Sequence, residues 1–292
     1  MLTEQRNPRT YEIDRLDTLE VLQVINDEDK TVALKVELVL PQIAQAVDAI
    51  AGRLAAGGRL IYIGAGTSGR LGILDAVECV PTYSTSPEMV QGIIAGGAPA
   101  VTRSVEGAED DEALAIADLK QVNLTPQDAV VGIAASGHTP YVLAAVRYAN
   151  EIGAFTAGVA CNVPAPLLDV AQIGIGVPVG PEVITGSTRM KSGTAQKMVL
   201  NMLSTATMVR LGKVYGNLMV DMQMTNSKLV RRARGIVMQV TGVDETRADE
   251  LLQQAGGKAK LAIAIHATGA SAEEAQRRLD AAQGRLRDVI ES

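Results

Sequence analysis

Residues 60–70, Leu-Ile-Tyr-Ile-Gly-Ala-Gly-Thr-Ser-Gly-Arg, decide the fold of this chain. The apolar run Leu60–Ile63 is continuous rather than alternating, which is typical of a strand buried on both faces of a parallel sheet. The glycine-rich segment Gly64–Arg70 follows at once and leads into a segment of helical length. Glycines let the backbone approach an anion, and the amides that begin the next helix point toward it. The stretch therefore predicts a strand, a loop and a helix with a candidate anion site at the loop.

Further apolar runs of the same character follow along the chain, separated by segments of helical length. Thr139 and Pro140 are expected to begin one of these helices, and Gly153 to end it. This alternation predicts an α/β fold, a doubly wound parallel sheet, over residues 57–216. The predicted strands are Leu60–Ile63, Val90–Ile94, Ala129–Ala134, Thr156–Ala160 and Ile173–Val177.

An N-terminal helical segment is expected over residues 1–56. Leucines at three-to-four spacing predict a first helix that stops near residues 26–29. Thr31 is expected to cap a second helix that runs to Leu54, with Pro41 bending or interrupting it.

A small C-terminal helical domain is expected over residues 217–292. It follows a long helical pattern that runs from Thr188 to Leu211 and ends at Gly212. Shorter amphipathic helices are expected over residues 244–255 and 272–282.

Composition excludes several classes of protein. The 292 residues carry 27 Lys and Arg against 33 Asp and Glu, a net charge of −6 with no basic run, which disfavours a nucleic-acid partner. Two cysteines and no apolar signal segment fit a reducing, cytoplasmic setting. Two histidines argue against a histidine-rich metal site. No apolar run approaches the roughly 18 residues of a membrane span.

A second polar loop, Ala135–Pro140, also follows a predicted strand and begins a helix. Loops at the carboxyl ends of neighbouring parallel strands converge on one crevice, so two hydroxyl-rich loops favour a phosphosugar site. The first loop also fits G-x-G-x-x-G, but Glu88, at the spacing of a ribose ligand, precedes the second strand and speaks against a dinucleotide. The alternatives without a ligand are that the first loop is only a tight turn, that Ser136 and Thr139 are only helix caps, and that His138 is only a surface histidine.

Two other segments carry candidate chemistry. Gly180–Thr194 is rich in hydroxyl side chains and glycine, contains two cationic residues and precedes a helix. This composition is typical of an anion site at a helix start, or of a helix cap without a ligand. Glu78 lies in an apolar stretch, so we expect its carboxyl group to be buried and to serve as an acid or base near neutrality. The acidic run Glu106–Glu112 is, on composition alone, a helix start favoured by the helix dipole.

These segments together resemble the sugar isomerase (SIS) superfamily. Within it they closely resemble the N-acetylmuramic acid 6-phosphate etherase family, which shares its Gly180–Thr194 signature with the glucokinase regulatory protein. The resemblance covers nearly the whole chain and weakens after about residue 231.

The resemblance implies a carbon–oxygen lyase of cell-wall amino-sugar catabolism and peptidoglycan recycling. Its substrate is N-acetylmuramic acid 6-phosphate, whose lactyl ether is eliminated and whose product is hydrated to N-acetylglucosamine 6-phosphate and D-lactate. It also implies a cytoplasmic homodimer with sites near the interface and no metal or organic cofactor.

The resemblance also implies roles for individual residues. Glu78 corresponds to the acid/base that protonates the departing lactate and later activates water, and Glu109 to the second acid/base. The substrate-binding positions carried over are Gly66, Thr67, Ser68, Ser136, Gly137, Thr139, Glu182, Ser187 and Lys191.

Helix geometry raises a difficulty for Glu78. Ten positions separate it from Ser68, which corresponds to about 15 Å along a helix and exceeds the length of a hexose phosphate. Either the helix breaks early, or the sugar lies along its side, or Glu78 serves a site across a dimer interface, which is the solution that we expect.

Three other functions are compatible with the same scaffold. An aldose–ketose isomerase would need a base near carbon 2 but would release no lactate. A non-catalytic sugar-phosphate sensor would resemble the glucokinase regulatory protein. A dinucleotide enzyme would bind NAD(H).

Overall fold

The computed structural model describes residues 1–224 and 227–291, which form two compact units. The first unit comprises Met1–Val77 and Glu88–Ser204, and the second comprises Glu78–Pro87 and Thr205–Ser292. The domain limits expected from the sequence, at residues 56 and 216, stay predictions. None of the described helices is both long and apolar enough to span a bilayer.

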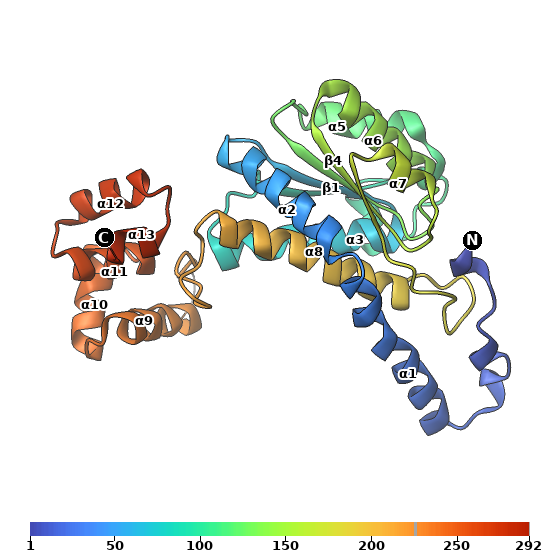
Figure 1. Cartoon of the computed structure of the whole chain (residues 1–292), viewed down its shortest axis with the longest axis horizontal. Coiled ribbons are helices and arrows are strands. Elements are labelled where there is room, and N and C mark those ends of the chain that lie inside the picture. Colours follow the sequence, from blue (N-terminus) through green and yellow to red (C-terminus); the bar gives the residue numbers. More distant parts are fainter. Residues whose placement is uncertain (225–226, 292) are drawn as a thin grey trace. The chain divides into compact units, whose positions relative to one another are not determined.

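A five-stranded sheet lies at the centre of the first unit (Figure 1). All pairs are parallel and the order is β2-β1-β3-β4-β5. The predicted strands agree with the observed ones to within one residue at each end, because continuous aliphatic runs are buried on both faces. The strands are β1 (Leu60–Gly64), β2 (Val90–Ile94), β3 (Ala129–Ile133), β4 (Phe155–Ala160) and β5 (Ile173–Gly176).

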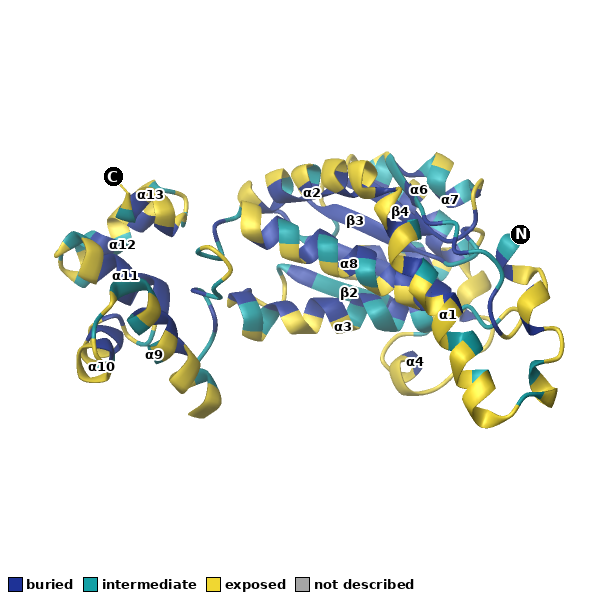
Figure 2. Ribbon diagram, turned by 60° about the horizontal axis from the view of Figure 1, so that its bottom comes forward, coloured by how far each residue is buried: buried dark blue, intermediate teal, exposed yellow. Residues whose placement is uncertain are grey.

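Helices cover both faces of the sheet, as a doubly wound fold requires (Figures 1 and 2). Ile61 and Ile63 of β1 point into the core beneath α5 and α6, whereas Tyr62 points to the opposite face. There its hydroxyl donates to Asp75 of α3, which also accepts from Ser204 of α8. The helices that lie wholly or mostly in this unit are α2 (Leu40–Ala55), α3 (Gly66–Tyr83), α4 (Pro99–Thr102), α5 (Glu112–Gln121), α6 (Pro140–Ile152), α7 (Pro166–Val170) and α8 (Lys191–Arg210).

The N-terminal helices differ from the prediction. Helix α1 (Thr18–Glu37) runs without a break through residues 26–31, because Asp17 and Glu20 form a capping box at its start and Asp27 and Lys30 form an ion pair within the polar stretch. Thr31 is therefore not a cap, and its hydroxyl donates to the Glu28 carbonyl. Pro41 lies in the first turn of α2, where its missing N–H costs no helical hydrogen bond.

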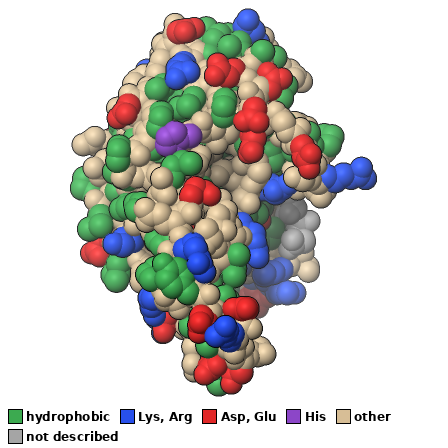
Figure 3. Space-filling model, turned by 90° about the vertical axis from the view of Figure 1, so that its right-hand side faces the viewer, with side chains coloured by type: hydrophobic (Ala, Val, Ile, Leu, Met, Phe, Trp, Pro, Cys, Tyr) green, Lys and Arg blue, Asp and Glu red, His purple; other side chains and the backbone are tan. Residues whose placement is uncertain are grey.

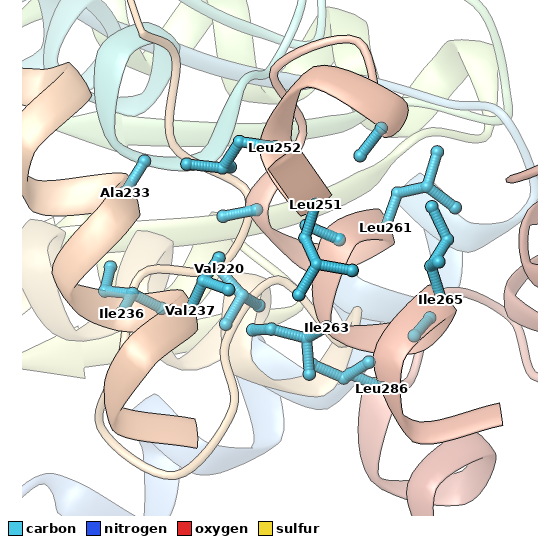
Figure 4. Close-up of a cluster of buried hydrophobic side chains, with 14 of the residues drawn as sticks. Val220, Ala233, Ile236, Val237, Leu251, Leu252, Leu261, Ile263, Ile265 and Leu286 are labelled. Atoms are coloured by element: carbon cyan, nitrogen blue, oxygen red, sulfur yellow. The ribbon is translucent and has the colours of Figure 1, made fainter. Parts of the chain in front are cut away.

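The second unit has its own hydrophobic core, built around the helix α11 (Ala259–Thr268) (Figure 4). The first seven residues of α11 are all buried, which explains why it is apolar on every side. Lys260 is one of them, and its ammonium group donates to Asp221 and to two backbone carbonyls. The surrounding helices are α9 (Ser227–Thr241), α10 (Glu245–Gln254), α12 (Ala272–Ala281) and α13 (Leu286–Ile290).

An ion pair between Arg59 and the buried Asp128 joins the amino ends of the neighbouring strands β1 and β3. Asp128 is only 1% exposed and accepts hydrogen bonds from Arg59 and from the backbone and hydroxyl of Thr125. Burial alone would raise the pKa of Asp128, but the Arg59 and Thr125 hydrogen bonds outweigh burial and lower it below the usual value. The pair therefore fixes where β1 and β3 begin relative to each other.

Replacing Asp128 tests this link. We expect Asp128→Ala to lower the free energy of unfolding by about 3 kcal/mol at neutral pH, because Arg59 and Thr125 lose a buried acceptor. Because the folded-state pKa of Asp128 lies below the unfolded value, its contribution is complete above the unfolded pKa and is lost as pH falls through the folded pKa. Denaturant unfolding of wild type and variant, from neutral to acid pH, measures both effects.

The control is Glu12→Gln, which removes an exposed ion pair with Arg15 and should change the free energy of unfolding by less than about 1 kcal/mol. Equal losses in the two variants would contradict a structural role for Asp128. So would a wild-type advantage over Asp128→Ala that does not shrink in acid.

Candidate active site

A cavity of about 420 Å³ opens at the carboxyl edge of the sheet. It lies where the strand order reverses, between β1 and its neighbour β3, the position at which open parallel sheets bind ligands. Figure 3 shows a hollow in this end of the molecule, with acidic side chains around it. The cavity is lined by Met1, Glu4, residues 65–68, Glu109, Asp110, residues 133–136, His138, Thr139, Pro140 and Thr188.

The first glycine-rich loop reaches the cavity because α3 starts very close to β1. A Cβ atom on Gly64 would lie 2.8 Å from the Gly69 nitrogen, and one on Gly69 would lie 2.7 Å from the Gly64 oxygen. Only glycine fits at both positions, so the amino end of α3 is held at the end of the strand. Gly66, Thr67 and Ser68 line the cavity, as predicted, and the Ser68 hydroxyl donates to Gln196 of α8.

The second loop enters the same cavity from the end of β3. Ser136 and Thr139 line it, so the expected convergence of the two hydroxyl-rich loops is confirmed. Gly137 has a φ of +71° and turns the chain without lining the cavity. Thr139 occupies the cap position of α6, but its side chain makes no capping hydrogen bond, so the expected cap is only positional. His138 is exposed on the cavity rim, and its ring Nδ1 lies 2.8 Å from the Ser136 carbonyl oxygen.

The two candidate carboxylates lie in different surroundings. Glu109, in the short 3₁₀ turn Ala108–Asp110, lines the cavity. Glu78 is exposed and does not line it, so the expected burial of Glu78 is wrong for this chain: it lies on the solvent-facing side of α3, next to exposed Val77. Because α3 continues to Tyr83, an early break of the helix does not bring Glu78 to the cavity.

Most of the named residues of the signature segment Gly180–Thr194 do not line the cavity. Glu182 is fully buried and accepts hydrogen bonds from the backbone nitrogens of Lys191 and Ser192, so it caps α8. Lys191 is 2% exposed, and its ammonium group lies 2.5 Å from Glu28 of α1. Neither side chain lines the cavity, and neither does Ser187, whereas the adjacent Thr188 does. The direct substrate contacts expected for these three residues therefore stay predictions, and of this part of the segment it is Thr188 that lines the cavity.

The N-terminal segment forms a wall of the cavity that the sequence did not reveal. Met1 and Glu4 line it. Thr3 is fully buried; its backbone nitrogen donates to the Asn162 side-chain oxygen, and its hydroxyl oxygen accepts from the Asn162 side-chain nitrogen. The Thr10 hydroxyl donates to the Val183 carbonyl. Thr3 and Asn162 are 159 residues apart in the sequence, so no local sequence pattern predicts their contact.

The Glu28–Lys191 ion pair links α1 to the start of α8, and substitution of either residue tests its contribution to stability. Burial acts to raise the pKa of Glu28, but interactions with Lys191, Asn7 and Arg9 together outweigh burial and lower the pKa below its usual value. We expect Lys191→Met to reduce the free energy of unfolding by about 3 kcal/mol, because Glu28 then loses its buried cationic partner and keeps Asn7 and the exposed Arg9. The double variant Glu28→Gln/Lys191→Met should lose less stability than Lys191→Met alone, which denaturant unfolding of wild type, the single variants Glu28→Gln and Lys191→Met, and the double variant measures.

One result would instead support the predicted contact between Lys191 and the substrate. If Lys191→Met unfolds like wild type and only raises KM, the lysine contacts substrate directly.

No cluster of three or more His, Cys, Asp or Glu side chains suited to a metal ion occurs within residues 1–224 and 227–291. The predicted absence of a metal stays a prediction. The cavity instead offers hydroxyl and backbone donors at a helix start beside carboxylates, which suits a phosphorylated sugar and proton transfer.

Comparison with known families agrees with this chemistry. A SIS domain model matches residues 112–206, the glucokinase regulatory protein N-terminal SIS domain matches residues 42–150, and the C-terminal lid domain of that protein matches residues 216–260. The fold and the cavity thus define a SIS-domain protein.

Full-length relatives narrow the class. The chain is 57% identical over 290 residues to the N-acetylmuramic acid 6-phosphate etherase of Vibrio vulnificus, covering 99% of this chain and 97% of that protein. It is 54% identical over 291 residues to that of Clostridium beijerinckii, covering 100% and 96%. The chain belongs to the N-acetylmuramic acid 6-phosphate etherase family.

Solved structures agree on the fold alone. A protein described as a phosphosugar isomerase of Bacteroides fragilis superposes with a TM-score of 0.52 at 17% identity, covering 74% of this chain and 97% of that one. A phosphoheptose isomerase from Francisella tularensis gives 0.50 at 16% identity, covering 66% and 98%.

Proposed function

We propose that this cavity is where the chain, as a member of the etherase family, cleaves the lactyl ether of N-acetylmuramic acid 6-phosphate. The products are N-acetylglucosamine 6-phosphate and D-lactate, and we expect the reaction to occur in the cytoplasm without a metal or organic cofactor. One observation carries the proposal: both hydroxyl-rich loops and Glu109 line a single cavity at the reversal of strand order. Full-length identity of 53–57% to named etherases supports the choice of reaction.

The phosphate belongs in the part of the cavity formed by the two loops. Thr67, Ser68, Ser136 and Thr139 offer hydroxyl groups there, and the start of α3 at Gly66 offers backbone amides. Holding the phosphate by these donors positions the remote carbons 2 and 3 of the sugar beside the carboxylates.

The reaction needs only proton transfers at carbons 2 and 3. Opening of the sugar ring exposes an aldehyde at carbon 1, which acidifies the carbon 2 proton. A base removes that proton, the bond from carbon 3 to the ether oxygen breaks, and the oxygen leaves with lactate after it is protonated. Water then adds a hydroxyl group to carbon 3 and a proton to carbon 2. We assign Glu78 to the lactate proton and the water, and Glu109 to the second acid/base role.

Isotope labelling tests the reaction. In ¹⁸O-labelled water the purified protein should release D-lactate without label and a sugar phosphate with label at carbon 3, which mass spectrometry distinguishes. Label in the lactate would indicate cleavage on the other side of the ether oxygen. Formation of a ketose phosphate without lactate would favour an isomerase, and binding without turnover would favour a sensor.

Substitution of the carboxylates tests their roles. Glu78→Gln and Glu109→Gln should each lower kcat by about 10²–10⁴-fold, the usual contribution of a general acid or base, with little change in affinity for N-acetylglucosamine 6-phosphate. Glu88→Gln, an exposed carboxylate just before β2, is the control and should keep wild-type kcat. Full lactate release by either active-site variant would move the role to another residue.

The exposed position of Glu78 supports a site shared between two subunits. We propose a homodimer in which Glu78 of one copy acts with Glu109 of the other. Helix α1 carries large apolar side chains in the open, which fits a surface that meets a partner. The exposed residues of α1 are Leu19, Leu22 and Leu34, and exposed Leu38 follows directly after the helix.

Mixing the two inactive variants tests the shared site. In a mixed dimer of Glu78→Gln and Glu109→Gln, one of the two sites has both carboxylates intact. Random exchange of subunits should therefore restore about a quarter of wild-type lactate release, since half the dimers are mixed and half their sites are complete. No recovery after demonstrated exchange, or activity from a strict monomer, would contradict the shared site.

A further inference from the structure

A second cavity of about 270 Å³ adjoins the first on the other side of the α3 start. The two cavities share Ala65, Gly66 and Glu109. The lining of the first contains carboxylates but, among the described residues, neither Lys nor Arg. The second contains Arg70 and Arg103 together with Glu106 and Glu109. Of the two linings, therefore, only that of the second cavity contains cationic side chains.

Arg70 fixes the wall of this second cavity. From the second turn of α3, its Nε atom donates to the Val101 carbonyl at 3.0 Å and its Nη2 atom donates to the Arg103 carbonyl at 3.1 Å. These bonds hold the backbone of Arg103 just after the short helix α4. Within residues 1–224 and 227–291, the exposed Arg103 side chain has no hydrogen bond or ion pair. Its guanidinium donors are available to an anion.

We propose that this second cavity binds the carboxylate of the lactyl group, with Arg103 as its main ligand and Arg70 as the residue that positions it. This inference rests on the proposed function. The substrate carries two anions, a phosphate at carbon 6 and a carboxylate on the ether at carbon 3. Hydroxyl groups and backbone amides serve the phosphate in the first cavity, and a planar guanidinium suits a carboxylate in the second. Glu109, which lines both cavities, then lies beside the carbons between the two anions.

A substrate pair separates carboxylate binding from every other contact. The lactyl carboxylate is compared with its carboxamide, which has nearly the same shape and no charge. Wild type should cleave the carboxamide with a kcat/KM lower by about ten- to a hundredfold, as expected for the loss of a charged hydrogen bond. Arg103→Gln should lose a similar factor on the carboxylate and discriminate little between the two substrates, and Arg103→Lys should regain part of the preference.

Two controls make the result specific. Arg147→Gln, an exposed arginine of α6 outside both cavities, should keep the wild-type preference. The affinity of Arg103→Gln for N-acetylglucosamine 6-phosphate, which has the phosphate but no lactyl group, should equal that of wild type.

Two outcomes overturn the carboxylate subsite. One is an unchanged preference in Arg103→Gln, whether kcat/KM stays at the wild-type value or falls equally on both substrates. The other is weaker binding of N-acetylglucosamine 6-phosphate, which would place the phosphate at Arg103 instead. A wild-type protein that releases no lactate from either substrate would instead overturn the proposed function.

Discussion

The parallel pairing of β1 with β3 is the constraint on which the rest of the structure depends. Because the sheet order reverses at this pair, the loops that leave the two strands open into one crevice. The Arg59–Asp128 pair fixes the strands at their amino ends, and the Gly64–Gly69 contact fixes the start of α3 at the other end. Backbone amides and hydroxyl groups at the crevice therefore follow from the sheet itself.

Polar contacts beneath the crevice then place segments that the sheet does not control. Glu182 caps α8, Lys191 of that helix pairs with Glu28, and Thr3 exchanges hydrogen bonds with Asn162. Each of these groups is buried, so losing one partner leaves the other unsatisfied in an apolar environment. The network explains how a residue as remote in sequence as Glu4 comes to line the cavity with Thr188.

The sequence was sufficient for the strands, both loops and their convergence, because these follow from local patterns and one rule of sheet topology. It failed at α1, where a run of polar residues resembles a break but contains the Asp27–Lys30 ion pair and lies in a helix that is capped at its start by Asp17. The sequence-based expectation that Glu78 is buried also failed. Successive side chains of a helix point in different directions, so apolar residues next to Glu78 in the sequence do not bury it. Contacts of Met1 and Glu4 were out of reach, since they depend on chain segments more than a hundred residues away. The expected substrate contacts of Glu182 and Lys191 stay predictions, and what the sequence did not predict is that both side chains make buried contacts with other segments of the chain.

The most direct measurement of the central claim is calorimetric binding of N-acetylglucosamine 6-phosphate to Thr67→Val/Thr139→Val. The double variant removes one hydroxyl group from each loop and keeps the shape of both side chains. If the loops jointly hold the phosphate, affinity should fall by at least about tenfold, since hydrogen bonds to charged groups contribute about 1.5–3 kcal/mol each. Wild-type affinity in a correctly folded double variant would contradict the account.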